Sequence, residues 1–336
     1  MLGVDIGSDS LKLALCKTKD RTVKKTAVAR MPANLLKDGR ITSPEAMGEL
    51  LRNTCRENGI RASKAALVLP NENTYLRTVV MPRMNAAQLV YNLPYEFNDY
   101  ITDELKNYVF DYAMITDLSQ EPDIPAEDAS APGMELMAVA APVQVLEEAK
   151  WIFRQAGLKL VKAAPTVCSY IALIRAAEQI QGGSGAREYC ILDLGFRAIR
   201  MHMFRGDRHM VTRILEIGLS ILDDVIADAY NVDVHLAHTY LVTNHEECQT
   251  KELCHATYNN IAVELMRALN FYRFSNPDSQ LSDVWLSGGG AVIAPLREAI
   301  SQTLDIQVHK AEELVQGGEM VENCYDCLQA IGITME

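Results

Sequence analysis

The stretch Gly3-Val4-Asp5-Ile6-Gly7-Ser8-Asp9-Ser10-Leu11-Lys12 places a carboxylate and a glycine turn at the end of an apolar strand. The same pattern returns in Ile191-Leu192-Asp193-Leu194-Gly195. A third cluster, Ser287-Gly288-Gly289-Gly290, follows the strand-like Val284-Trp285-Leu286 and precedes a helical pattern. The recurrence after about 190 residues indicates a fold built from two similar halves.

These turns have a shared chemistry. Backbone N–H groups in such turns hold phosphate oxygens, and Asp carboxylates hold a hydrated Mg²⁺. A glycine lets the backbone approach a ligand without obstruction by Cβ. The three turns therefore predict one nucleotide between the two halves. Asp5 has an alternative as a simple strand-turn residue, but an acid inside Val4-Asp5-Ile6 is costly without a partner. Lys12 has an alternative as an outward residue of its strand.

Bulk properties exclude several classes of protein. A chain of 336 residues is long enough for two domains. The net charge of −12 argues against nucleic acid as a partner. No apolar run approaches the roughly 20 residues that span a bilayer, and no signal peptide is apparent. The eight scattered cysteines suit reduced thiols in a cytosol.

The first part of the chain shows clear strand and helix signals. Leu2–Ile6, Lys12–Cys16 and Val23–Arg30 predict a β-meander. Ser43 and Pro44 predict a helix start, and Asn58-Gly59 its end. Further strands are expected at Ala65–Leu69 and Tyr75–Val80.

A separate subdomain is expected to begin at Met81-Pro82. Its first helix starts near Ala86 and is broken at Pro94. The remaining elements are strands at Tyr108–Ile115 and Glu135–Ala141, an acidic loop at Asp117–Gly133, and a helix from Val143 to Ala156 that is closed by Gly157. A helix over Ala163–Glu178 should then return to the first half, and Gln181–Gly185 reads as a flexible linker.

The second half repeats the opening. The expected elements are a strand to Asp193, strands at Ile199–Phe204 and His209–Leu215, a turn at Arg205-Gly206-Asp207, and helices over Gly218–Phe274. His235 and His238 lie near one another on one of these helices. This pair has an alternative as metal ligands, but without nearby carboxylates or thiols the two are expected to be surface or packing residues.

This series resembles the PilM family of type IV pilus assembly proteins, which are relatives of the division protein FtsA in the actin-like ATPase superfamily. The matching segments, in order, are Gly3–Lys12, Asp38–Ile41, Leu67–Pro70, Arg77–Pro82 with the helix that carries Glu96, Asp193–Gly195, Arg213–Gly218, Glu264–Arg267 and the Gly288 turn. The resemblance covers nearly the whole chain. It implies an α/β protein with a duplicated actin-like (ribonuclease H-like) ATPase fold and an FtsA-type inserted subdomain.

The resemblance also implies a domain organisation. Residues 1–80 form the first actin-like half, together with 158–180 and 315–336. Residues 81–157 form the inserted α/β subdomain. Residues 186–314 form the second actin-like half, with a helical subdomain around 219–275.

ATP and Mg²⁺ are the cofactors that the resemblance implies, with Asp5 and Asp193 holding the metal through water. The expected nucleotide-binding residues are Asp5, Gly7, Ser8, Ser10, Lys12, Asp193, Gly195, Arg197, Gly218, Glu264, Arg267, Gly288, Gly289 and Gly290. The second loop departs from the superfamily: Arg197 either contacts phosphate there, or Phe196 crowds the pocket. Glu264 and Arg267 either contact the nucleoside or form an ordinary surface pair at i,i+3.

Hydrolysis is expected to be slow at most. In chaperone relatives the residue before a Pro-Thr at the returning helix is an acid that orients the attacking water. Here that position is Ala164, whose methyl group cannot orient water. No catalytic residue is assigned.

The resemblance implies a cytoplasmic scaffold, peripheral to the inner face of the cell membrane, that works with other pilus assembly components. It would dock the N-terminal peptide of a PilN-like inner-membrane protein in a groove between the first half and its inserted subdomain. The expected groove residues are Arg77, Met84, Leu89, Leu93, Phe97 and Phe110. Apolar residues at this spacing have an alternative as the subdomain's own core.

Two other functions stay open: a sugar or carboxylate kinase of the same superfamily, and an FtsA-like filament protein. The inserted subdomain carries an apolar helix and an acidic loop in place of a kinase's substrate-binding polar residues. The sequence ends at Ala330–Glu336 without an amphipathic helix like that of FtsA, so direct membrane insertion is not expected.

Overall fold

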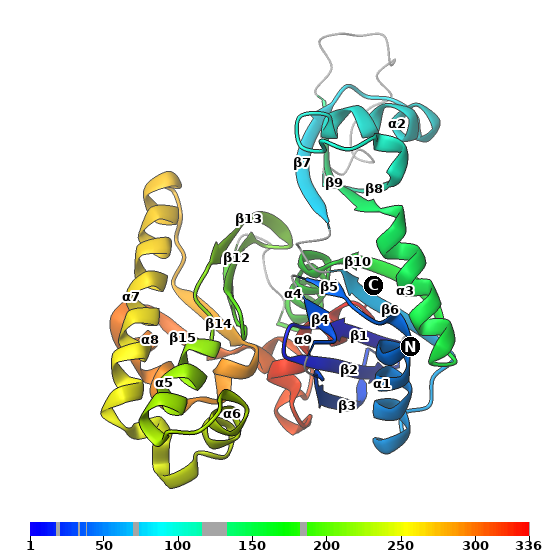
Figure 1. Cartoon of the computed structure of the whole chain (residues 1–336). Helices are drawn as coiled ribbons and strands as arrows, with labels where there is room; N and C mark the ends of the chain where they lie inside the picture. The colour runs from blue at the N-terminus through cyan, green and yellow to red at the C-terminus, as the bar shows by residue number, and fades with distance from the viewer. Residues whose placement is uncertain are drawn as a thin grey trace. The chain divides into compact units, whose positions relative to one another are not determined.

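The computed structural model describes residues 1–17, 21–32, 34–37, 39–69, 74–115, 133–181 and 187–335 (Figure 1). The chain divides into two compact units. Unit 1 consists of Met1–Met31 and Val167–Glu336, and unit 2 consists of Pro32–Thr166. The finer domain boundaries expected from the sequence stay a prediction.

The opening meander of unit 1 forms as predicted. Strands β1 (Leu2–Ile6), β2 (Ser10–Cys16) and β3 (Val23–Arg30) pair antiparallel in sequence order. Helix α9 (Cys324–Gly332) lies directly against β1. A Cβ on Gly3 would stand 1.7 Å from the carbonyl oxygen of Ala330, so only glycine permits this approach.

The second sheet of unit 1 repeats this meander and extends it. Its order is β13-β12-β11-β14-β15. The strands are β11 (Glu188–Leu194), β12 (Ile199–Arg205), β13 (Arg208–Leu215), β14 (Asp283–Ser287) and β15 (Gln307–Lys310). The first three pair antiparallel, whereas β14 joins β11 in parallel and β15 joins β14 in parallel. Asp193 is thereby placed opposite Ser287, just before the Gly288 turn.

Helices of unit 1 cover the second sheet and supply its core (Figure 1). They are α5 (Ser220–Tyr230), α6 (Val234–Thr243), α7 (Glu252–Ser275) and α8 (Ala294–Leu304). Unit 1 also contains α4 (Thr166–Gln181) and short 3₁₀ turns at His245–Thr250, Gly289–Val292, Ala311–Leu314 and Gly318–Met320. The apolar faces of α5 to α8 bury residues such as Leu222, Leu241, Leu265 and Leu296 against β11, β12 and β14. This burial fixes the strand ends that carry the glycine turns.

Unit 2 begins with the short strands β4 (Leu36–Lys37) and β5 (Arg40–Ile41) and helix α1 (Pro44–Glu57). The predicted helix start is confirmed, because the Ser43 side chain accepts a hydrogen bond from the Ala46 N–H and Pro44 opens the first turn. The predicted end is confirmed at Asn58, after which Gly59 takes φ +59°.

Strand β6 (Lys64–Leu69) pairs in parallel with β10 (Lys159–Pro165). The helix predicted over Ala163–Glu178 is therefore wrong in its first three residues, since Ala163, Ala164 and Pro165 complete β10 and α4 begins at Thr166. A proline disfavours helical backbone in the residue before it, which keeps Ala164 extended and delays the helix.

The inserted elements of unit 2 form a three-stranded antiparallel sheet in the order β7-β9-β8. The strands are β7 (Tyr75–Met81), β8 (Tyr108–Met114) and β9 (Met134–Pro142). One face is covered by α2 (Ala86–Asn92) and the 3₁₀ turn Leu93–Phe97, which confirms the helix break predicted at Pro94. A short turn at Leu105–Asn107 and helix α3 (Val143–Gln155) complete the insertion.

Some predicted features fall on residues outside the described ranges. These are Asp38 and Pro70 of the matching segments, the acidic loop Asp117–Gly133 apart from Gly133, and the linker Gln181–Gly185 apart from Gln181. Within the described residues, no helix has the length and apolar character that crossing a membrane requires.

Candidate functional site

The first glycine turn joins β1 to β2 and positions Asp5 and Lys12 side by side. The Gly7 N–H donates to the Ser10 carbonyl over 3.0 Å, which closes the turn. Asp5 and Lys12 are register partners on the paired strands. Ser8 and Ser10 lie half-buried in the same turn.

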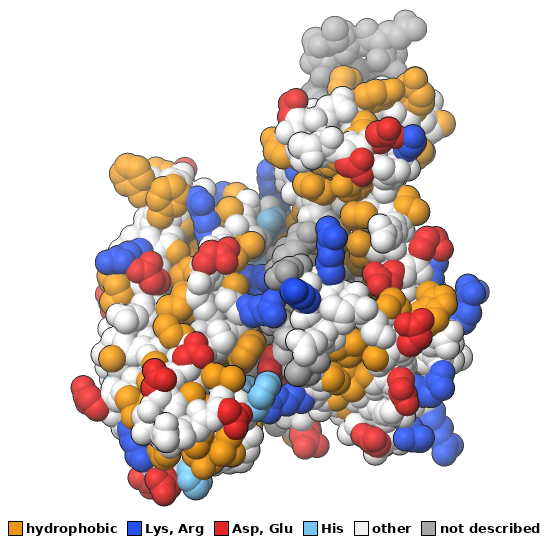
Figure 2. All heavy atoms as spheres, viewed as in Figure 1, with side chains coloured by type: hydrophobic (Ala, Val, Ile, Leu, Met, Phe, Trp, Pro, Cys, Tyr) orange, Lys and Arg blue, Asp and Glu red, His pale blue; other side chains and the backbone are white. Residues whose placement is uncertain are grey.

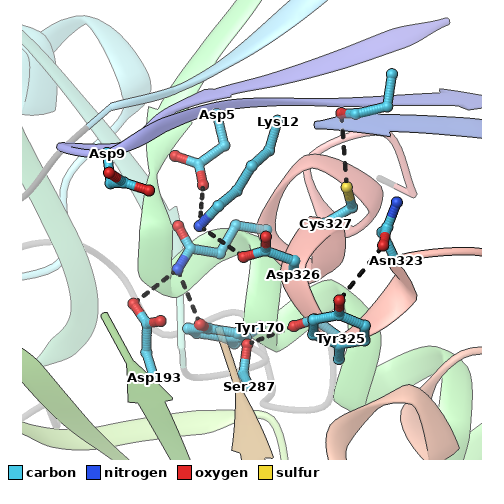
Figure 3. Close-up of polar contacts among 12 residues, drawn as sticks. Asp5, Asp9, Lys12, Tyr170, Asp193, Ser287, Asn323, Tyr325, Asp326 and Cys327 are labelled. Carbon is cyan, nitrogen blue, oxygen red and sulfur yellow. Dashed lines mark hydrogen bonds and ion pairs between the residues drawn. The ribbon is translucent and has the colours of Figure 1, made fainter. Parts of the chain in front are cut away.

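Lys12 lies between two carboxylates, as Figure 3 shows. Its Nζ is 3.1 Å from Oδ1 of Asp326, on α9, and 3.8 Å from Oδ2 of Asp5. Burial by itself lowers the pKa of Lys12, but the charges of Asp326, Asp5 and Asp193 outweigh it and hold that pKa above its ordinary value. Lys12 is therefore a cation held in place by its partners, with 13% of its side chain exposed.

Asp5 is 8% exposed. Burial raises the pKa of this carboxyl from 3.8 to about 6, the Lys12 ammonium opposes the rise, and the charges of Asp193 and Asp326 add to it. The repulsion between Asp5 and Asp193 indicates that the two predicted metal-holding carboxylates, one from each sheet, share one electrostatic environment.

Asp193 is held from α9 by an amide. The Gln329 Nε2 donates over 3.0 Å to Oδ2 of Asp193 and over 3.0 Å to the Tyr170 hydroxyl oxygen. These three side chains are all buried. Gln329 thus orients the Asp193 carboxylate from the side of the C-terminal helix (Figure 3).

The third glycine turn passes close to the same carboxylate. Gly288 has φ +81°, and a Cβ there would lie 2.7 Å from Oδ1 of Asp193. A Cβ on Gly290 would lie 2.7 Å from that of Leu194, whereas one on Gly289 would meet no atom within 4 Å. The backbone at Gly288 and Gly290 therefore packs tightly against β11, and the backbone at Gly289 borders open space.

The second glycine turn is backed by the start of α5. The Leu219 N–H donates to the Gly195 carbonyl over 3.1 Å, and the Ser220 N–H donates to that of Phe196 over 2.9 Å. A Cβ on Gly218 would lie 2.3 Å from the Phe196 carbonyl oxygen, which explains the glycine. Arg197 is exposed and Phe196 half-buried. A phosphate contact by Arg197 stays a prediction.

The Phe196 ring meets a group that the sequence interpretation missed. It lies edge-on to the His238 imidazole with ring centroids 5.8 Å apart. His238 Nδ1 is 2.9 Å from Oδ2 of Asp223, and its Nε2 is 3.9 Å from Oδ2 of Asp9 in the first glycine turn. The expectation that His238 lacks nearby carboxylates is therefore wrong, because folding brings Asp223 and Asp9 to it.

Glu264 and Arg267 form an ion pair one turn apart on α7, with side chains 44% and 68% exposed. This ion pair matches the second interpretation of the two residues, an ordinary surface pair at i,i+3. A contact of either residue with a nucleoside stays a prediction.

Asp5 and Asp193 are the two carboxylates that the sequence predicts to hold a metal ion. Among the described residues, no three His, Cys, Asp or Glu side chains are grouped closely enough to hold an ion. Mg²⁺ commonly keeps several waters and takes one or two carboxylates, which fits Asp5 and Asp193. These two residues would hold Mg²⁺ through water, and the glycine turns would hold phosphate.

The residues predicted to bind a partner all lie in unit 2. Leu89, Leu93 and Phe97 are 2%, 1% and 0% exposed and belong to the core beneath the β7-β9-β8 sheet. Met84 and Phe110 pack against that core and are partly buried. In this conformation the three buried residues are part of the insertion's own core, which is the alternative that the sequence analysis gave for them. Their role in docking stays a prediction.

Arg77 is held on β7 by two contacts. Its guanidinium donates to the Glu96 carbonyl and lies 3.7 Å from the centroid of the Tyr100 ring. The half-buried Arg77 therefore has a defined orientation beside the exposed Tyr100, which follows the 3₁₀ segment.

Two similar meanders, an Asp–Gly turn at the end of the first strand of each, and a late glycine turn define a protein of the actin-like ATPase fold class. By structure, the chain is similar to a solved "PilM-PilN type IV pilus biogenesis complex", with a TM-score of 0.81, 22% identity, and coverage of 99% of this chain and 97% of that one. It is also similar to the ethanolamine utilization protein EutJ from Carboxydothermus hydrogenoformans, with a TM-score of 0.60, 15% identity, and coverage of 99% and 88%.

The sequence identifies the family. The family model described as type IV pilus assembly protein PilM matches residues 3–323, so the chain belongs to the PilM family. A comparison with curated proteins gave no match. The predicted family and fold class are both confirmed.

Proposed function

We propose that this protein is an ATP-binding scaffold of type IV pilus assembly that docks the N-terminal cytoplasmic segment of a PilN-like inner-membrane protein. Membership of the PilM family supports the pilus role and does not favour the kinase alternative. The proposal places the protein in the cytoplasm, held at the inner face of the membrane through that partner.

The observation that carries nucleotide binding is the convergence of Asp5, Lys12 and Asp193 beside the glycine turns of unit 1. The open space at Gly289 leaves room for a ligand at the third turn. Lys12 supplies a fixed positive charge for phosphate, and Asp5 and Asp193 supply negative charge for Mg²⁺ through water. When bound, the metal would neutralise phosphate charge.

Calorimetric titration with ATP, with and without Mg²⁺, tests this site. Binding should require Mg²⁺ for full affinity, and Asp193→Ala should weaken it. The exposed Asp224 offers a control, because Asp224→Ala makes the same charge change at a solvent-exposed side chain. Absence of heat with ATP, ADP and GTP at millimolar concentration would mean that Phe196 has closed the pocket.

Docking is supported by the inserted sheet of unit 2. The helical side of the insertion, on which Arg77 lies, carries exposed aromatic side chains, with Tyr95 54% and Tyr100 50% exposed. Figure 2 shows hydrophobic side chains on the surface of this part of the molecule. An extended peptide binds such a surface by apolar anchors and backbone hydrogen bonds. Arg77 and Met84 border this sheet and its covering helix.

A fluorescent peptide of the partner's first residues, titrated into the protein, tests docking. Arg77→Glu should weaken binding because it removes the contacts with Glu96 and Tyr100 and reverses a charge. Lys106→Glu, a charge reversal at a side chain that is 76% exposed, is the matched control. Equal affinity for a scrambled peptide, or binding mapped only to residues 186–314, would refute the docking model.

A further inference from the structure

The His238 side chain lies beside both the first and the second glycine turns of unit 1. It lies on α6, its Nε2 faces Asp9 in the first turn at 3.9 Å, and its ring faces Phe196 of the second turn. Helix α6 and these turns belong to the same compact unit. The nucleotide-binding residues predicted from the sequence do not include His238.

The imidazole is oriented from behind by Asp223. Its Nδ1 donates to Oδ2 of Asp223 over 2.9 Å, and Asp223 is 4% exposed. A carboxylate that accepts from one ring nitrogen fixes the orientation of the ring and the direction of the other nitrogen. Nε2 is therefore directed toward the Asp9 side of the site.

The charges around His238 favour the imidazolium. The hydrogen bond that His238 donates to Asp223 raises the pKa of the imidazole, burial opposes the rise, the charges of Asp223 and Asp9 add to it, and the charge of Arg30 lowers it. The net effect is a rise above the ordinary value. The protonated ring donates from both nitrogens.

We propose that His238, positioned by Asp223, is a ligand for the terminal phosphate of a nucleoside triphosphate and makes the site prefer triphosphate over diphosphate. This inference rests on the proposed nucleotide binding. In the proposed site, the backbone of the first turn holds phosphate. A terminal phosphate beside that turn would contact Nε2 of His238 where the Asp9 carboxylate now lies. The Asp9 carboxylate competes with that phosphate for the imidazolium.

The experiment compares the affinities of AMP-PNP and ADP, each with Mg²⁺, by calorimetry. His238→Gln should reduce affinity for AMP-PNP by about tenfold or more, the loss expected for one hydrogen bond to a charged group, and leave ADP affinity within about twofold. Asp223→Asn should act in the same direction, since it removes the positioning carboxylate. His235→Gln, on the same helix, should change neither affinity.

Asp9→Asn supplies an independent test from the other side of the ring. Removing the competing carboxylate should raise the preference for AMP-PNP, whereas a purely structural bridge between Asp9 and His238 would lose affinity for both ligands. Circular dichroism of each variant shows whether it folds.

The preference should also depend on pH. It should be greater at about pH 6 than at about pH 9, because the imidazolium loses its proton over this range, and His238→Gln should abolish that difference. Equal losses for AMP-PNP and ADP, or no loss for either, would overturn the inference and leave nucleotide binding intact. Absence of binding of both nucleotides to the unaltered protein would instead refute the proposed function itself, and the inference with it.

Discussion

Asp5→Asn should stabilise the folded protein above about pH 6 while it weakens nucleotide binding. Burial raises the pKa of this carboxyl from 3.8 to about 6. Between these two pH values the folded state therefore keeps a proton that the unfolded chain has already released. The contribution of Asp5 to stability therefore falls as pH rises from about 4 to about 6. At about 1.4 kcal/mol per pH unit, the full cost is about 3 kcal/mol. Asparagine has nearly the same shape and carries no charge.

Urea unfolding at about pH 4, 6 and 8 measures this difference. The chain has two tryptophans, so a Trp151→Phe background leaves Trp285, 3% exposed on β14, as the fluorescence reporter of unit 1. The variant and its parent should be nearly equal at about pH 4, and the variant should be more stable by up to about 3 kcal/mol at about pH 8. Asp224→Asn, the same charge change at an exposed site, should show no such trend. A variant less stable than its parent at about pH 8, or a difference independent of pH, would refute the reasoning.

Two further predictions concern this site, and a third concerns turnover. Gly288→Ala should lower the urea midpoint and abolish ATP binding in calorimetry, because its Cβ would meet Asp193 at 2.7 Å and its φ is +81°. Gly289→Ala should leave the urea midpoint unchanged because nothing lies within 4 Å; equal midpoints of the two variants would contradict this. Gln329→Leu should lower the free energy of unfolding by about 1.5 to 3 kcal/mol, since it removes a donor to a buried charge; an unchanged urea midpoint would argue against it. Phosphate release should stay below about 1 s⁻¹, the low end of ordinary enzymes, because Ala164 cannot orient water; faster turnover, or stimulation by a small sugar, would favour a kinase.

The sequence predicted what depends on local signals. The β1–β3 and β11–β13 meanders, the Ser43 cap and the break at Pro94 each follow from a few neighbouring residues. The helix predicted from Ala163 failed because pairing of β10 with β6 decides the conformation there, and that partner lies far away in the sequence. The strand-ending Asp and Gly residues were found because their pattern repeats.

The rest of the site depends on tertiary contacts and could not be read from local patterns. Gln329 and Asp193 are 136 positions apart, and Asp326 reaches Lys12 only because α9 packs on β1 through Gly3. Asp223 and His238 are 15 positions apart on different helices. No spacing rule links such pairs, and their polar side chains look like ordinary helix residues until the helices are placed.

The central claim is that the three glycine turns of unit 1 form one nucleotide site. Hydrogen–deuterium exchange of the full chain, with and without Mg²⁺ and ATP, tests it most directly, because backbone amides are the expected phosphate ligands. We predict slower exchange, on adding both, in three segments together: 3–12, 193–198 and 288–292. Binding of ATP that leaves these segments unchanged, or that slows exchange in only one of them, would contradict the account.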